Sequence, residues 1–323
     1  MNLYSNIEEV GWNSFLIKNN PPNLIKMTNY SIEQFSKITN IPKINLRTWE
    51  NRYSYLIPLR TKTNIRVYND ELLVRGINTK LLLESGYKIS KISKLDDQEI
   101  KIALDRIESF ASKDVKVTYY LNNFIISAIN FDEYKFNRLF IKALNEFDFV
   151  VFYKVIILPL LKRVGILWLT NKMSPSQEHF LSELIKQKLY TLIDRTSVST
   201  PGKDKWLLFL PEHEFHEIGL LFAKYILSLK ENNVIYLGDN LPIDTLSGVA
   251  EKHKIDNILL FFITNYSLKM SETHLQKLTK IFPQSKIFVV TPNKKLNIPK
   301  LKTSNINIIR DIDGFIKLLD SPN

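Results

Sequence analysis

The sequence predicts three folded parts in series: an all-α winged helix-turn-helix domain, a four-helix bundle, and a doubly wound α/β domain with a parallel sheet. Three observations carry this prediction. Two short helical segments flank a four-residue break at residues 39–42. Residues 115–196 hold apolar side chains at helical spacing with one glycine and two prolines. After residue 205, short continuous apolar runs alternate with helical stretches, which is the pattern of buried parallel strands joined by helices.

Length and composition place the chain among folded, multidomain proteins. Its 323 residues are about twice the ~150 residues expected of one domain. The 45% hydrophobic and 24% charged content, with 9 Gly, excludes collagen-like and largely disordered chains. The absence of Cys excludes disulfides, zinc–thiolate sites and a cysteine nucleophile. No apolar run reaches the ~20 residues of a membrane span, and Glu8 and Glu9 stand where a signal peptide is basic. We therefore expect a cytoplasmic protein with no membrane partner.

The first folded part begins with the helix-turn-helix pattern. Ser31 and Gln34, three residues apart, form a capping box at the start of the first helix. Pro42 suits the first turn of a second helix that runs to about Tyr53. Two short helices across a four-residue turn are the signature of this motif. The expected order of the remaining elements is a basic hairpin or wing at residues 58–68, a helix from Asp70 to near Gly86, a short helix at residues 89–95 and an acid-and-lysine connector at residues 96–114.

The chain divides at its polar segments. Thr200-Pro201-Gly202 lies in the clearest linker, residues 197–205. Four helices, about the minimum for a bundle, account for the helical spacing before it. The apolar runs after it predict strands at residues 206–210, 234–237, 258–263, 287–290 and 306–309. The resulting division is an extension at residues 1–27, a winged helix-turn-helix domain at 28–97, a helical bundle at 115–196 and an α/β domain at 204–321.

Basic charge is concentrated on the predicted helix-turn-helix. The chain has a net charge of +11, and residues 36–68 hold seven basic residues against the single acid Glu50, a net +6. Such a concentration indicates a polyanionic partner. Arg47 and Asn51 are four residues apart and share a helix face, where Arg can read guanine and Asn adenine. Trp49 faces the apolar side and is expected in the core. Contacts to phosphates are expected from the other basic residues of this region, Arg52, Arg60, Lys62 and Arg66.

The order of these residues resembles the MerR family of transcriptional regulators. The matching segments are Leu46-Arg47-Thr48-Trp49-Glu50-Asn51-Arg52-Tyr53, Pro58-Leu59-Arg60 and Arg66-Val67-Tyr68. The resemblance implies an operator in double-stranded DNA and adds Tyr68 to the candidate DNA-binding residues. Asn64 stands where the family usually has a wing glycine, and Asn tolerates the left-handed backbone. The family's metal-binding cysteines are absent, which excludes a metal- or redox-sensing member.

A second motif follows the first strand of the predicted sheet. Ligands of doubly wound folds sit beyond the carboxyl ends of the strands, at the switch point between the first and the third. There, Glu214-x-His216-x-x-Gly219 places an imidazole on a loop with a carboxylate two residues before it. A carboxylate on one ring nitrogen orients an imidazole that binds a metal through the other. Gly219 permits a ligand or backbone to approach closely. His213, one residue outside the pattern, is expected to be a surface histidine.

This motif resembles the acid-x-His-x-x-Gly sequence of cobalamin-binding domains, which contain a flavodoxin-like sheet. The resemblance implies that His216 is the lower axial ligand of cobalt and displaces the cofactor's own base. Residues 234–242, with Gly238 in a turn, are similar to the second strand and turn of that family. The implied cofactor is cobalamin, and the implied metal is its cobalt.

The bundle carries a third similarity. Trp168, followed after nine residues by Glu178 and His179, resembles the helical cap of the cobalamin-dependent MerR-like photoreceptors typified by CarH and LitR. In that family these side chains cover the upper face of the corrin and its adenosyl group, which implies adenosylcobalamin. The residues alone leave an alternative, in which Trp168 is bundle core and Glu178 is a favourable charge at the positive end of a helix dipole.

Three positions depart from that family. Leu169 follows Trp168 where light-sensing members carry a His able to capture cobalt. The third strand leads into Phe261-Phe262-Ile263-Thr264, without the Ser-x-Leu that holds the nucleotide tail of cobalamin. The fourth ends in Val289-Val290-Thr291-Pro292, where a Gly-Gly pair normally admits that tail. Bulky side chains at these two places are expected to narrow the channel for the tail.

Together these features predict a sequence-specific DNA-binding transcriptional regulator, a repressor and not an enzyme, controlled by adenosylcobalamin between bundle and α/β domain, with light as a candidate signal. The resemblance implies a homo-oligomer, either a dimer or a tetramer. Two alternatives stay open. One is a MerR-like regulator whose degenerate cobalamin site senses another ligand or a protein partner. The other, a corrinoid carrier for methyl transfer, is disfavoured because a DNA-binding head replaces any substrate domain, and no Gly-rich phosphate loop or catalytic triad is recognisable.

Overall fold

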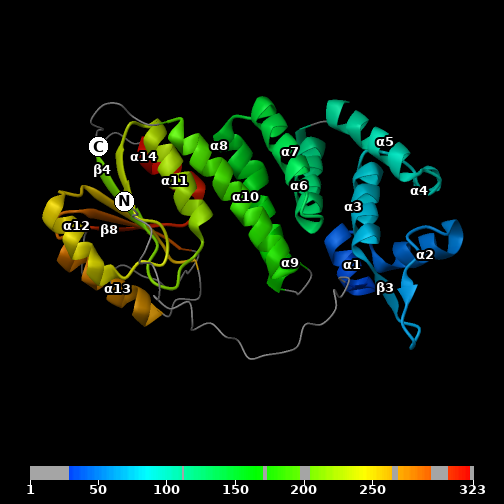
Figure 1. Ribbon diagram of the computed structural model, residues 1–323, viewed down its shortest axis with the longest axis horizontal. Helices are drawn as coiled ribbons and strands as arrows, with labels where there is room; N and C mark the ends of the chain where they lie inside the picture. The colour runs from blue at the N-terminus through cyan, green and yellow to red at the C-terminus, as the bar shows by residue number, and fades with distance from the viewer. Residues whose placement is uncertain are drawn as a thin grey trace, which may run out of the picture. The chain divides into compact units, whose positions relative to one another are not determined.

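A computed structural model of the chain (Figure 1) describes residues 29–110, 113–169, 173–196, 204–263, 268–291 and 305–320. The chain forms two compact units, Met1–Asn122 and Asn123–Asn323. The extension predicted at residues 1–27 and most of the linker predicted at residues 197–205 lie outside the described residues. No described helix combines the length and the apolar composition needed to cross a bilayer.

In the first unit, helices α1 (Ile32–Thr39) and α2 (Lys43–Tyr53) form the predicted helix-turn-helix. The capping box is confirmed, because the Gln34 N–H donates to the Ser31 hydroxyl and the Ser31 N–H donates to the Gln34 side chain. Three short antiparallel strands lie in the order β1-β3-β2, and their pairing confirms the predicted wing. Their bounds are Tyr30–Ser31 for β1, Leu59–Arg60 for β2 and Arg66–Tyr68 for β3.

Three more helices follow in the first unit: α3 (Asp70–Glu84), α4 (Ile89–Ile92) and α5 (Asp97–Phe110). The connector predicted at residues 96–114 is therefore wrong over most of its length. Arg75 of α3 holds the start of α5 by donating to Asp97 (2.5 Å) and to the Leu95 carbonyl oxygen (2.7 Å). The charged residues of this segment obscured a buried apolar face at helical spacing, formed by Ile100, Ala103, Leu104 and Ile107.

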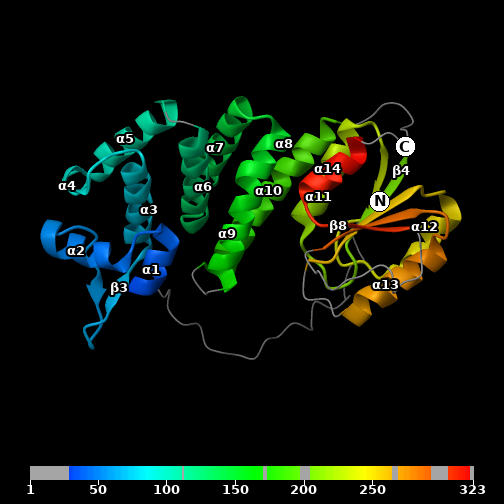
Figure 2. The ribbon, with the colours of Figure 1, turned by 180° about the vertical axis from the view of Figure 1, so that it is seen from behind.

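The predicted bundle consists of four helical segments (Figure 2). The first, α6 (Lys113–Ile129), crosses the boundary between the two units. The third contains a π-helical turn that the sequence analysis did not predict, because apolar periodicity does not report the hydrogen-bond register within a helix. The other segments are α7 (Glu133–Glu146), the continuous run α8 (Phe149–Phe152), η1 (Tyr153–Ile157) and α9 (Leu158–Leu169), and α10 (Pro175–Asp194).

The second unit also contains a five-stranded parallel sheet in the order β5-β4-β6-β7-β8. All five predicted strands are confirmed to within two residues at their ends. This order is that of a flavodoxin-like fold, so the switch point lies between β4 and β6. The bounds are Lys205–Phe209 for β4, Asn233–Tyr236 for β5, Asn257–Phe261 for β6, Lys286–Val290 for β7 and Ile306–Ile309 for β8.

Helices cover both faces of the sheet (Figures 1 and 2), which confirms the doubly wound class. One face packs on α13, where Leu207, Leu260 and Val289 share a core with Leu275. The other face packs on α11 and α14. Alternate residues of a strand point to opposite faces, so each strand serves both cores. The elements are α11 (Glu217–Leu229), the 3₁₀ turn η2 (Ile243–Leu246), α12 (Ser247–Lys252), α13 (Leu268–Ile281) and α14 (Ile312–Asp320).

Candidate functional sites

The outer face of α2 carries the residues expected to read DNA bases. Arg47 and Asn51 are both exposed and lie four residues apart. Leu46 and Trp49 are buried, so the prediction that Trp49 belongs to the core is confirmed. A helix with one face packed on its domain and polar side chains on the other can present those side chains to a major groove.

Glu50 joins α2 to the wing. Its carboxylate accepts a hydrogen bond from Nε of Arg66 (2.6 Å) and pairs with the guanidinium of Arg60. Only 11% of the Glu50 side chain is exposed. Burial acts to raise the pKa of Glu50, but the hydrogen bonds and charges of Arg66 and Arg60 outweigh it and hold the pKa below its ordinary value. Two of the expected phosphate-binding arginines thus also fix the wing against the helix.

The remaining candidate DNA contacts, on α2 and the wing, differ in exposure. Arg52 and Lys62 are exposed, as contacts to phosphate require. Asn64 has a φ of 61° at the wing turn, so the left-handed turn predicted there is confirmed.

For Tyr68 the structure corrects the expected DNA contact, because the residue is 0% exposed and its ring stacks on Phe35 with centroids 4.2 Å apart. Burial raises the pKa of Tyr68 to about 12. The family motif suggested a DNA contact, whereas packing of β3 against α1 makes this residue part of the core.

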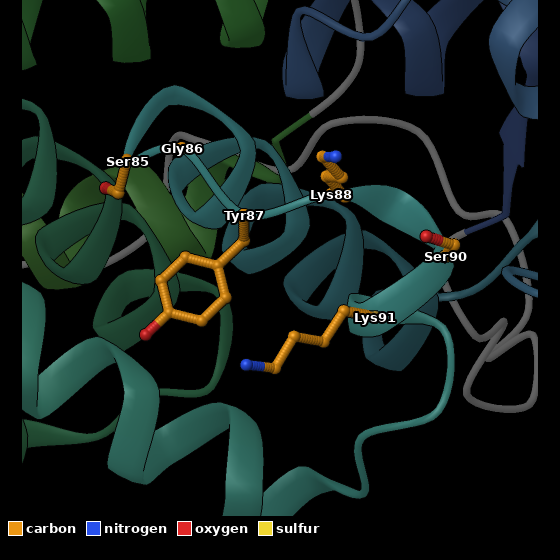
Figure 3. Close-up of a pocket in the computed structure, with 6 residues that line it drawn as sticks. All are labelled: Ser85, Gly86, Tyr87, Lys88, Ser90 and Lys91. Atoms are coloured by element: carbon orange, nitrogen blue, oxygen red, sulfur yellow. The ribbon is translucent and has the colours of Figure 1, made fainter.

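An open basic pocket of about 350 Å³ lies between α3 and α4 (Figure 3). Gly86, with a φ of 91°, makes the turn that forms it. The Lys91 ammonium lies 5.8 Å from the centre of the Tyr87 ring. Ammonium and hydroxyl groups together suit an anion such as a DNA phosphate. Two lysines and two serines around one glycine are a visible sequence signal for this group, although no site was predicted there. The lining residues are Ser85, Gly86, Tyr87, Lys88, Ser90 and Lys91.

Glu214 and His216 form the dyad expected from the sequence. Nδ1 of His216 lies 2.5 Å from Oε1 of Glu214. Glu214 is fully buried, and its carboxylate also accepts hydrogen bonds from the N–H groups of Phe215 (3.1 Å), His216 (3.2 Å) and Ile263 (2.8 Å). Backbone from two loops therefore fixes the carboxylate, which in turn orients the imidazole. Nε2 is the nitrogen left for a metal, and 57% of the His216 side chain is exposed.

The negative charges near His216 come from both the helical bundle and the α/β domain. The hydrogen bond to Glu214 raises the pKa of His216 against the effect of burial, and the charges of Glu214 and Glu178 add to the rise. Glu178 lies in the first turn of α10, so the structure brings this residue of the predicted cap into electrostatic range of His216. His179, in the same turn, is exposed. The side chain of Trp168 lies outside the described residues, and its expected role stays a prediction.

Gly219 and Gly238, the two glycines of the predicted cofactor site, occupy positions that favour glycine for different structural reasons. A Cβ atom at residue 219 would lie 2.7 Å from Cε2 of Phe261, so the space beside Gly219 is filled by that ring. Phe261 is the last residue of β6 and is 8% exposed. Gly238 follows β5 with a φ of 81°, a conformation that L side chains rarely adopt.

Glu217, beside His216, was missed by the sequence analysis. Its Oε1 accepts hydrogen bonds from the hydroxyls of Tyr190 (3.0 Å) and Tyr236 (2.8 Å). The ammonium of Lys186 lies 3.6 Å from Oε2. Tyr190 and Lys186 belong to α10 and Tyr236 to β5, so this carboxylate joins the bundle to the α/β domain. No local pattern in the sequence pairs these residues, because they come together only when the two parts pack.

A corrin cofactor fits one part of this site and not another. His216 offers an oriented imidazole on an exposed loop, which suits an axial ligand of cobalt. At the switch point between β4 and β6, where this fold admits a ligand, the Phe261 ring lies against Gly219. This agrees with the narrowing expected from the bulky residues of the third strand. The residues thus fit a cobalt ligated by His216 and do not fit a nucleotide tail beside Gly219.

Comparison with known proteins finds two family matches within the chain. Residues 30–99 match the MerR HTH family of regulatory proteins, and residues 120–193 match the B12 binding domain. The HTH-type transcriptional repressor CarA of Myxococcus xanthus is 28% identical over 72% of this chain and 76% of CarA. CarH of the same organism is 24% identical over 79% of this chain and 86% of CarH. The solved monomethylamine corrinoid protein of Methanosarcina barkeri has 14% identity and a TM-score of 0.48, over 61% of this chain and 95% of that chain.

These matches fall on the elements described above. The first extends from β1 into α5, and the second from α6 into α10. The relatives are named as transcriptional repressors and not as enzymes. The chain is therefore a DNA-binding transcriptional regulator with a MerR-type helix-turn-helix domain and a B12-binding domain, and it is homologous to the CarA and CarH repressors over most of its length.

Proposed function

We propose that this regulator is a repressor whose DNA binding is controlled by cobalamin, in its adenosyl form, held between the helical bundle and the α/β domain. The observation that carries the proposal is the Glu214–His216 dyad, an exposed imidazole whose Nδ1 lies 2.5 Å from a buried carboxylate. The names of CarA and CarH support repression as the direction of control. Assembly as a dimer or tetramer, in the cytoplasm, belongs to the same proposal.

On the DNA side, we assign the reading of base edges to Arg47 and Asn51, which share the exposed face of α2. Because Arg60 and Arg66 share Glu50, we expect each to contribute less charge to a phosphate than Arg52 or Lys62. In this assignment the DNA-binding domain comprises residues 28–97, the bundle residues 115–196 and the α/β domain residues 204–321. The phosphate contacts are assigned to Arg52, Arg60, Lys62 and Arg66, with Lys88 and Lys91 of the basic pocket as further candidates.

On the cofactor side, His216 binds through Nε2 while Glu214 holds the other ring nitrogen and keeps the imidazole oriented. When bound, cobalamin would supply a cobalt centre, and Nε2 of His216 would be the protein atom that holds it. The bundle residues assigned to the upper face are Trp168, Glu178 and His179. Gly219, in the first turn of α11, leaves room for the Phe261 ring, and Gly238 makes the turn after β5.

A second candidate is favoured by one observation. The Phe261 ring fills the space beside Gly219, which favours a MerR-like regulator whose degenerate cobalamin site senses another ligand or a protein partner. Because the relatives are named as regulators, a corrinoid carrier for methyl transfer is the weaker alternative.

Uptake of adenosylcobalamin by the purified protein in the dark tests the first candidate against the second. We expect a protein-bound visible spectrum to survive gel filtration in stoichiometric amount and to disappear in His216→Ala. His213→Ala, which changes an exposed histidine of the same loop, is the matched control and should bind as the wild type does. Lack of uptake by the wild type would sink cobalamin control and leave the second candidate.

A response of DNA binding to light is a separate question from cobalamin binding. Leu169 has no ligand atom for cobalt, so capture of the metal by residue 169 after illumination is not expected. Gel shifts of the cofactor-loaded protein in dark and light decide the point. A loss of the DNA complex in light supports a photoreceptor, whereas identical complexes assign a light-independent cobalamin sensor.

A further inference from the structure

The ligand crevice of this fold can be located from the sheet alone. In the order β5-β4-β6, the chain leaves β4 toward one edge of the sheet and leaves β6 toward the other. The helices that follow, α11 and α13, cover opposite faces. Doubly wound folds bind ligands in the crevice that opens between two such strands at their carboxyl ends. Here the crevice lies between the loop that begins at Leu210 and the end of β6 at Phe261.

That crevice is closed by packing. The Phe261 ring lies so close to Gly219 of α11 that an added Cβ would be 2.7 Å from Cε2 of the ring. Its exposed fraction is 8%. The contact is tighter than ordinary van der Waals packing would allow for any residue but glycine at position 219.

A hydrogen bond closes the crevice a second time. The N–H of Ile263, two residues beyond Phe261, donates to Oε2 of Glu214 at 2.8 Å. Glu214 is fully buried and comes from the loop after β4. The ends of β4 and β6 are thus joined by a carboxylate that also orients His216. The imidazole itself remains accessible, so the metal-binding edge is open while the crevice beside it is shut.

From this contrast we infer that the site selects a corrin ring without a nucleotide tail in the switch-point crevice, and that Phe261 is the residue that sets this selection. The inference rests on the proposed cobalamin function and deepens it by naming a preference within the ligand class: cobalamin binds at the cost of displacing the Phe261 ring, and a tail-less corrinoid of the cobinamide type binds without that cost. Cobalamin carries a ribose, a phosphate and a two-ring base on one side arm, and cobinamide lacks all three. Entry of that arm requires the Phe261 ring to leave its buried place.

The experiment compares two probes on the purified full-length apoprotein. Aquacobinamide and hydroxocobalamin are titrated separately, and the change in visible absorption on ligation by His216 gives each Kd. Because the base of cobalamin competes with His216 for cobalt, the wild-type ratio of the two Kd values does not decide by itself. The deciding quantity is the change in that ratio in Phe261→Ala. We expect cobalamin to bind roughly tenfold to a hundredfold more tightly in the variant, the range that corresponds to burying one Phe side chain, and cobinamide to change by less than about threefold.

Two controls and a second test variant separate selection by Phe261 from a general loosening of the fold. Phe288→Ala removes a buried ring that stacks on Trp206 at the start of β4, with centroids 5.3 Å apart, and should leave the ratio unchanged. Phe261→Leu shortens the ring side chain while keeping an apolar group, and serves if the alanine variant does not fold. His216→Ala should abolish the spectral change with both probes.

The outcomes are distinct. A gain for cobalamin alone in Phe261→Ala or Phe261→Leu supports the selection. An unchanged ratio in both variants overturns it and leaves the proposed cobalamin function intact. Failure of both probes to change the spectrum of the wild type overturns the selection together with the proposed function.

Discussion

Glu214 has more hydrogen-bond partners than its position two residues before His216 indicates. In the sequence it is a carboxylate two residues before a histidine. In the folded chain it accepts hydrogen bonds from three backbone N–H groups and lies 2.5 Å from the His216 ring. The dyad itself was predictable because its members are neighbours. The contact with Ile263 was not, because 49 residues separate the partners and only pairing of β4 with β6 brings them together.

The orienting role of Glu214 gives the first prediction. Glu214→Gln keeps the size of the side chain, but the amide NH₂ group cannot accept the hydrogen bonds that a carboxylate oxygen accepts from backbone N–H groups. We expect the affinity for aquacobinamide to fall roughly tenfold to a hundredfold, as for other partners of metal-binding histidines. Absorption titration measures it. Glu212→Gln, an exposed acid of the same loop, is the control, and equal Kd values for Glu214→Gln and wild type would contradict the assigned role.

At the scale of elements, α2 and the wing are held as one piece by Glu50. We expect Glu50→Gln to lower the free energy of unfolding by roughly 1.5–3 kcal/mol, the range for hydrogen bonds to charged groups. The pKa of Glu50 is lowered in the folded chain, so its contribution is present above the ordinary value of 4.5 and is lost as pH falls through the lowered value. Urea unfolding of both proteins from neutral to acid pH measures the difference.

The control for Glu50 is an ion pair of the same unit. Glu33 and Lys43 are 3.0 Å apart with exposed side chains, so Glu33→Gln should change stability by less than about 1 kcal/mol. A difference between wild type and Glu50→Gln that stays constant into acid would show that the carboxylate charge is not what holds the wing.

The same elements divide the work of DNA recognition. Arg47→Ala should cost roughly 1–3 kcal/mol of discrimination between the preferred and a mismatched duplex. Lys62→Ala should weaken both duplexes equally and reduce the salt dependence by about one phosphate contact. Fluorescence anisotropy at several salt concentrations, with a duplex selected from a random pool, measures both. Loss of discrimination in Lys62→Ala instead would reverse the assignment of helix and wing.

Elements were predicted best where one local pattern decides them. The capping box of Ser31 with Gln34, the wing turn at Asn64 and the five buried strands all follow from spacing or residue type. The errors have a common cause in tertiary packing. Helix α5 was obscured by its charged face, and Tyr68 was assigned by motif to DNA although it packs on Phe35. The bulk of Phe261 was visible in the sequence, but its fit to Gly219 was not.

At the scale of the second unit, the contacts that join the helical bundle to the α/β domain include an aromatic stack and a shared carboxylate. Tyr153 of η1 stacks on Phe222 of α11 with centroids 3.7 Å apart. Glu217 binds Tyr190 and Lys186 of α10. Tyr153 is a buried residue of the π-helical segment η1, and π-helical turns are often found at functional positions. A ligand bound between the helical bundle and the α/β domain would therefore contact two surfaces whose relative position is already fixed by these contacts.

Glu217 gives the prediction at this scale. Glu217→Gln should lower the Tm of the protein and weaken binding of aquacobinamide. The reason is that the carboxylate at the start of α11 contacts Tyr190 and Lys186 of α10, and its loss should cost roughly 1–3 kcal/mol. Binding of DNA by the apoprotein should not change. The matched control is Glu183→Gln on α10, an acid that pairs with Lys186 and is exposed. Equal loss of cofactor affinity in the two variants would mean that Lys186, and not the link to α11, is responsible.

The central claim is that one ligand site, centred on His216, controls DNA binding by the whole chain. The most direct measurement is the Kd of the full-length protein for a selected duplex, with and without adenosylcobalamin in the dark, for wild type and for His216→Ala. We expect the cofactor to change the wild-type Kd by about tenfold or more, within the usual range of coupling between sites, and to leave His216→Ala unchanged. An equal Kd with and without cofactor in a wild-type protein shown to bind it would contradict the claim.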